Sequence, residues 1–79
     1  MKSIKEQIEE QQKQELSRLL DWAGNQSRLA DMLGVTRQVV YGWLMRGRIS
    51  ATAAAEAEKQ TRGIISKRSL RPDVKEWRL

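Results

Sequence analysis

The chain has 79 residues, of which 39% are hydrophobic and 32% are charged, with a net charge of +5 at pH 7. A chain of this length forms one small domain with a limited core, so a large internal catalytic pocket is not expected. Cysteine and histidine are both absent, which excludes disulfides, the common zinc sites and the usual general base at neutral pH. We therefore expect a protein that is not an enzyme and that uses no cofactor and no metal ion.

The basic excess lies at the C-terminal end of the chain. Residues 1–25 carry four basic against five acidic side chains (−1), residues 26–58 four against three (+1), and residues 59–79 seven against two (+5). A basic segment of this kind is typical of chains that meet a polyanion. The first residues, MKSIKEQIEEQQ, lack the apolar core of a signal peptide, and no apolar run is long enough for a membrane span. We expect a soluble intracellular protein with no membrane partner.

The first predicted helix covers residues 3–23 and ends at Gly24, and leucines at helical spacing line one face of its second half. Its first half offers only Ile4 and Ile8 as apolar side chains and cannot bury much surface alone. We interpret residues 1–14 as an N-terminal helical extension. It is a solvated helix, a frayed tail or a helix that pairs with a partner subunit.

Residues 26–45, QSRLADMLGVTRQVVYGWLM, predict two short helices that meet at a glycine turn. Asn25 can cap the first helix, and Gly34 can end it by adopting a left-handed conformation. Thr36 can cap the second helix, which runs to about residue 46. The buried stripe of this second helix has the i, i+3, i+4 spacing and consists of Val40, Trp43 and Leu44.

A further helix and an irregular segment complete the predicted fold. Ile49 and Ser50 have the pattern of a hydrophobic staple and a cap before the alanine-rich stretch ATAAAEAEKQT, which stops at Gly63. The remaining residues include the only proline and predict short helical turns in irregular chain. The fold class is all-α with four to five helices, divided into an N-terminal extension (1–14), a helix-turn-helix domain (15–63) and a basic C-terminal segment (64–79).

Two stretches carry a family resemblance. Residues 26–45 resemble the helix-turn-helix of the bacteriophage Cro and repressor family, with Ala30 at the helix crossing, Gly34 at the turn and Val40 six positions later. The later stretch GIISKRSLRPDVKEW resembles the end of YdaS-like proteins, Cro-related prophage regulators that are sometimes called antitoxins. The resemblance implies a lambda-repressor-like fold and a transcriptional repressor that acts as a dimer on operator DNA, in the cytoplasm of a bacterial host and on its nucleoid.

The exposed face of the predicted recognition helix, at about residues 36–46, carries no acid, whereas a solvated helix face usually mixes both signs. Arginine can bind guanine and glutamine can bind adenine with paired hydrogen bonds in the major groove of DNA. We predict that the bases are read by Arg37, Gln38, Tyr41, Gly42 and Met45. Phosphate contacts, which supply most of the affinity, are predicted for Gln26, Ser27, Arg28, Thr36, Arg46 and Arg48.

Two alternatives to the repressor stay open. An excisionase bends attachment-site DNA and favours direct repeats, whereas an antitoxin neutralises a toxin, here through the N-terminal extension. The expected partners are double-stranded DNA, a second copy of the chain in a homodimer or a DNA-dependent oligomer, and a toxin or repressor protein. Two candidate dimer surfaces follow from the apolar residues outside the helix-turn-helix: the Ile4 and Ile8 edge, or the segment with Ile64, Ile65, Leu70 and Trp77.

Overall fold

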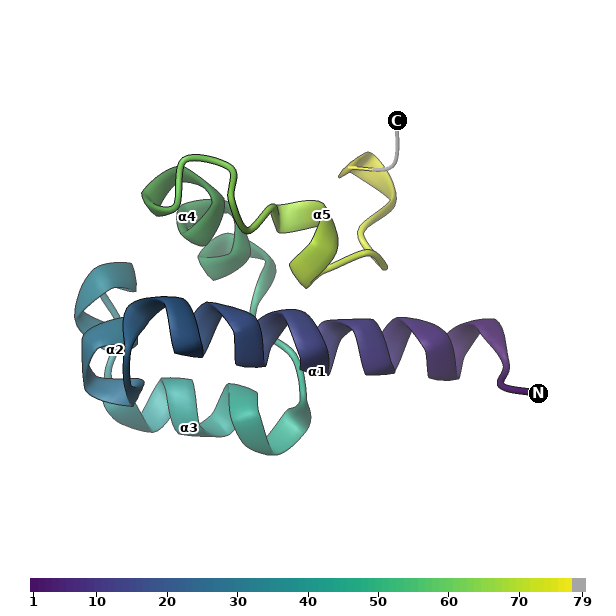
Figure 1. Ribbon diagram of the computed structural model, residues 1–79, viewed down its shortest axis with the longest axis horizontal. Helices are drawn as coiled ribbons and strands as arrows, with labels where there is room; N and C mark the ends of the chain where they lie inside the picture. Colours follow the sequence, from purple (N-terminus) through teal and green to yellow (C-terminus); the bar gives the residue numbers. More distant parts are fainter. Residues whose placement is uncertain (78–79) are drawn as a thin grey trace.

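The computed structural model describes residues 1–77, and the last two residues of the predicted C-terminal segment lie outside this range. Within it the chain forms five α-helices, one 3-10 turn and no strand, which confirms the predicted all-α fold class (Figure 1). None of the helices in residues 1–77 is long and apolar enough to cross a membrane. The elements are α1 (Ile4–Ala23), α2 (Gln26–Leu33), α3 (Arg37–Arg46), α4 (Ala51–Gln60), α5 (Lys67–Leu70) and η1 (Lys75–Trp77).

The helix starts follow from side chains that accept a backbone hydrogen bond from the first turn. Such caps satisfy amide groups that have no partner inside the helix. They are Ser3, Asn25, Thr36, Ser50 and Ser66. Gly34 ends α2 with a φ of 69°, in the left-handed region that glycine adopts without strain, as predicted. The fourth helix ends at Gln60, three residues before the predicted stop at Gly63, and residues 61–63 form a turn.

A single apolar core holds the helices together. Trp43 is its largest fully buried side chain, with 2% of its surface exposed, and Val40 beside it on α3 is fully buried. The predicted inner stripe of α3 is therefore confirmed at these two positions, while Leu44 is partly buried against the core. The buried apolar residues are Leu16, Leu19, Leu29, Ala30, Leu33, Val40, Trp43, Ile49, Ala53, Ala54, Ala57, Ile65 and Leu70.

The C-terminal segment belongs to this core, which corrects one of the two candidate dimer surfaces. Ile65 and Leu70 have 1% and 0% of their surface exposed, because α5 packs against both α1 and α4. They are not available to a second subunit. Trp77 is partly buried against the core, and the Lys67 ammonium lies 4.9 Å from its ring centroid. Of this group, Ile64 remains exposed.

A polar clip fixes the end of the chain. Arg71 donates from Nε and Nη2 to the two carboxylate oxygens of Asp73, at 2.9 and 2.7 Å, and from Nη1 to the carbonyl of Ile49 at 3.1 Å. Gln12 of α1 donates to the same carboxylate at 2.9 Å. The clip thus joins α1, the α3–α4 connection and the C-terminal segment. Gln12 is buried, although its place in the polar extension predicted little burial.

The clip predicts a stability loss in acid. Hydrogen bonds from Arg71 lower the pKa of the Asp73 carboxyl to about 2. Because this pKa lies below its ordinary value, the stabilisation is complete above about pH 4 and is lost as the pH falls toward 2. We expect Asp73→Asn to lower the free energy of unfolding at pH 7 by about 1 kcal/mol, after allowing for solvent screening. Urea titrations at pH 7 and pH 2.5 should show a smaller difference between variant and wild type at the lower pH; an equal difference at both would contradict the clip.

Candidate nucleic-acid interface

The outer face of α3 is exposed and carries no acid. The helix lies at the edge of the molecule, away from α4 (Figure 1). Its sequence, RQVVYGWLMR, contains only neutral and basic side chains. Tyr41 and Met45 have 56% and 68% of their surface exposed, and Arg37 and Gln38 are exposed as well. The structure therefore places these four predicted base-reading residues on one accessible helix face.

A shallow hollow joins this face to the start of α2. Gln26, Arg37, Gln38 and Tyr41 line it, and Ser27 lines a neighbouring depression that also includes Gln26 and Arg37. The N-terminus of α2 and the first turn of α3 thus face the same space, and both helix ends offer amide groups and partial positive charge. Residues predicted separately for phosphate and base contacts meet at this place.

Two of the predicted phosphate contacts have structural roles of their own. Thr36 is exposed, and its hydroxyl oxygen accepts the Val39 amide at 3.2 Å as the cap of α3. The side chain of Arg28 folds back against Gly24 in the α1–α2 turn, where an added Cβ would lie 3.2 Å from the guanidinium. Arg28 is nevertheless exposed, so its charge remains at the surface near the α2 N-terminus.

Gly42 and Arg46 form a contact that the sequence did not predict. A Cβ on Gly42 would lie 3.1 Å from Nη1 of Arg46, which shows that the guanidinium folds back over this position one turn earlier in α3. Gly42 is therefore partly buried rather than freely outward, and the lack of a side chain lets the arginine lie close to the helix backbone. Arg46 and the following Arg48 are both exposed.

Gly42→Ala is expected to separate stability from binding. Alanine is about 1 kcal/mol more favourable than glycine inside a helix, and the guanidinium that it meets is the flexible end of a side chain. We expect the free energy of unfolding to rise by about 0.5–1 kcal/mol in a urea titration. If α3 approaches DNA closely here, affinity for duplex DNA should fall in the same variant. A variant that is more stable and binds DNA unchanged would contradict the close approach.

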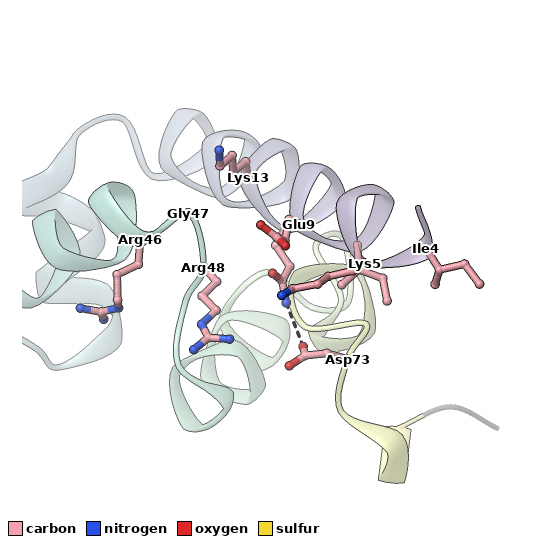
Figure 2. Close-up of a pocket in the computed structure, with 10 residues that line it drawn as sticks. Ile4, Lys5, Glu9, Lys13, Arg46, Gly47, Arg48 and Asp73 are labelled. Atoms are coloured by element: carbon pink, nitrogen blue, oxygen red, sulfur yellow. Dashed lines mark hydrogen bonds between the residues drawn. The ribbon is translucent and has the colours of Figure 1, made fainter. Parts of the chain in front are cut away.

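A second hollow lies under the N-terminal half of α1 (Figure 2). The turn from Arg46 to Arg48 forms one wall of this hollow, and Asp73 lies on the other wall. Lys5 and Lys13 line the hollow from α1. Lys13 packs across Gly47, where an added Cβ would lie 2.8 Å from its side chain. The sequence alone does not single out either lysine, because no local pattern pairs residue 13 with residue 47. Lys13 adds positive charge beside the end of α3, whereas Lys5 shares the far part of the hollow with Glu9 and Asp73.

Neither hollow has the composition of a metal site. In the part of the chain that the structure describes, no three side chains of the types His, Cys, Asp and Glu form a group that could hold a metal ion. Every buried side-chain nitrogen or oxygen in this part has a hydrogen-bond partner. The hollow between α2 and α3 is lined by guanidinium, amide and phenol groups, whereas the hollow under α1 also includes the carboxylates of Glu9 and Asp73.

The fold and this surface define a small all-α protein of helix-turn-helix architecture. A family model described as "Bacterial toxin YdaS" matches residues 16–79, and the chain belongs to this family. The predicted relation to YdaS-like proteins is thereby confirmed, while the match says nothing specific to Cro proteins. Comparisons with curated proteins and with solved structures gave no match. The matched region begins within α1, so residues 1–15 lie before it.

Proposed function

We propose that the protein is a sequence-specific double-stranded DNA-binding regulator that reads operator half-sites with α3 and represses transcription by excluding polymerase. The observation that carries this proposal is the hollow where the α2 N-terminus meets Arg37, Gln38 and Tyr41 on an acid-free face. An α-helix fits the major groove, and side chains near its N-terminus reach base edges first. We place the protein in the bacterial cytoplasm, on the nucleoid.

The two ends of α3 have different tasks in this proposal. Gln26 and Ser27, with the amides of the first α2 turn, hold one phosphate strand beside the groove. Arg48, after the end of α3, holds the other strand, and Lys13 adds charge beside it. Between them Arg37 and Gln38 contact base edges. Affinity then depends on salt, whereas sequence preference depends on the two central side chains.

A selection from random duplex DNA tests this function. Purified protein should enrich a short motif that contains guanine and adenine, the bases that arginine and glutamine bind with paired hydrogen bonds. The double variant Arg37→Ala, Gln38→Ala should keep its helical circular dichroism and lose the enrichment, because both side chains are exposed. The double variant Lys59→Ala, Arg62→Ala, exposed at the end of α4, is the matched control. No enrichment by the wild-type protein would contradict the proposal.

The family description supports a second candidate function, inhibition of host growth. The matching family is named for a bacterial toxin. We infer that such toxicity would act through the same DNA-binding face, by repression of host genes. Induced expression in a bacterial host should then arrest growth, and the Arg37→Ala, Gln38→Ala variant should not. Equal growth arrest by both proteins, at matched protein levels, would show that toxicity does not depend on the DNA-binding face.

A further inference from the structure

The N-terminal half of α1 extends past the core of the molecule (Figure 1). Its first turns carry Ile4, with 76% of its surface exposed, and Ile8, which is partly buried. Together with Lys5 and Glu9 they line the hollow of Figure 2. Apolar and charged side chains thus share one open surface, the overhang groove, formed by this half of α1, the Arg46–Arg48 turn and Asp73.

We propose that the overhang groove binds a second copy of this chain, with the two α1 helices antiparallel and centred on residue 6. In this register Ile4 of each copy faces Ile8 of the other, which brings together the apolar side chains of the groove. Lys5 of each copy then lies within two residues, roughly 3 Å along the helix axis, of Glu9 of the other, which is within reach of the two long side chains. The helix is therefore self-complementary in both charge and apolar character, as a twofold interface requires.

A third feature of the sequence agrees with this register. Lys2 contacts Glu10 within one copy, and the antiparallel helix offers each of them the opposite charge of the second copy as well. Both residues are exposed, so nothing in the monomer core holds them. Lys2 and Lys5 lie near the start of the helix and Glu9 and Glu10 lie further along, with Glu6 between them. A parallel pair would bring Lys2, Lys5, Glu9 and Glu10 each against its own charge, whereas the antiparallel pair brings the lysines near Glu9 and Glu10.

The distance between the two α3 helices follows from the same register. In Figure 1, α3 runs antiparallel to α1, and its end at Gly47 meets the side chain of Lys13. The midpoint of the ten-residue α3 is therefore level with about residue 18 along the axis of α1. From the centre of the pair to residue 18 is roughly 18 Å at 1.5 Å per residue, and twofold symmetry doubles this to roughly 36 Å. One turn of B-DNA spans about 34–36 Å. This step rests on the proposed DNA-binding function.

The groove also places both α3 helices on one side of the pair. On α1, Lys13 meets the α3 turn on one flank of the groove face, and Gln12 meets Asp73 on the other flank. We place the twofold axis between the two α1 helices, perpendicular to both and running from the Asp73 flank to the α3 flank. Rotation about this axis leaves the α3 helices of both copies on the same side of the pair. The two recognition faces can then meet one face of a DNA duplex.

The interface is small, because each copy contributes about three helical turns. We expect a weak dimer, with a dissociation constant in the micromolar range, that adjacent half-sites stabilise by holding two copies together. Because the dimer is weak, reversal of a single interface charge should change its dissociation constant measurably. Lys5→Glu puts two acids opposite each other, and Glu9→Lys puts two bases opposite each other, so each variant alone should self-associate at least tenfold more weakly.

Mixing the two variants tests the pairing. In a mixed dimer of Lys5→Glu and Glu9→Lys, every residue at position 5 again faces the opposite charge at position 9. Sedimentation equilibrium of the equimolar mixture should return within about threefold of the wild-type dissociation constant. If a substitution weakened association only by changing contacts within its own helix, mixing it with the other variant would not restore the dissociation constant. Lys59→Glu, exposed on α4 outside the groove, is the control and should associate as the wild type does.

Two results would overturn the inference: wild-type protein that stays monomeric at several hundred micromolar, or charge variants that associate like wild type. DNA titrations distinguish a failure of the proposed dimer from a failure of the proposed DNA-binding function. Wild-type protein that dimerises but binds no duplex contradicts only the DNA-binding proposal. Protein that binds a single half-site with the same affinity in wild type and both charge variants, and remains monomeric in solution, contradicts only the dimer.

Discussion

Trp43→Ala is expected to remove a large part of the free energy of unfolding of the protein. The indole is the largest fully buried side chain and joins α3 to the core. Truncation of a buried tryptophan costs about 3–5 kcal/mol, through lost apolar burial and the cavity left behind. A domain of this size has a total stability of about 4–12 kcal/mol, so the loss removes much of it.

The matched control for this prediction is Trp22→Ala. Trp22 lies on α1 with 46% of its surface exposed, so its truncation should lower the free energy of unfolding by less than about 1 kcal/mol. Urea titrations followed by circular dichroism at 222 nm compare the two variants directly. If Trp43→Ala is as stable as Trp22→Ala, the helix-turn-helix packing described above is wrong.

Arg37→Ala and Arg48→Ala are expected to change DNA binding in different ways. Loss of a paired contact to guanine lowers discrimination at one base pair by about 1–3 kcal/mol, whereas loss of a phosphate contact weakens all sequences alike and reduces the salt slope by about one. Both side chains are exposed, so neither change should alter folding. Fluorescence anisotropy on the selected motif, on its single-base variants and on random duplex, at several salt concentrations, measures both effects.

Arg68→Ala is the control for the arginine pair. Arg68 is exposed on α5, away from the α2–α3 hollow, and its loss should leave sequence discrimination unchanged. Equal losses on selected and random DNA for both Arg37→Ala and Arg48→Ala would contradict the division between base reading and phosphate binding. A loss confined to Arg68→Ala would instead move the DNA surface to the C-terminal segment.

Helix starts and the inner side of α3 were predictable because their signals are local. A cap accepts an amide three residues ahead, and a buried stripe repeats every three or four residues, so both can be read from adjacent letters. Asn25, Thr36 and Ser50 are the clearest cases. The left-handed end of α2 at Gly34 followed from the same kind of local rule.

The clip and the second hollow were not predictable, because they join positions far apart in the chain. Gln12 meets Asp73 across 61 positions, and Lys13 meets Gly47 only because α3 ends beside α1. The apolar residues of the C-terminal segment predicted a candidate dimer surface, yet Ile65 and Leu70 within it are core. Apolar spacing alone does not distinguish a core contact from a subunit contact in a segment this short.

The central claim is that α3 reads DNA, and a footprint of the purified protein on the DNA beside its own gene tests it most directly. We expect a short protected palindrome whose half-sites are one helical turn apart, lost in the Arg37→Ala, Gln38→Ala variant. Protection that spreads over direct repeats would favour an excisionase that uses the same face. No protection at any protein concentration, together with no motif from the random duplex selection, would contradict the account.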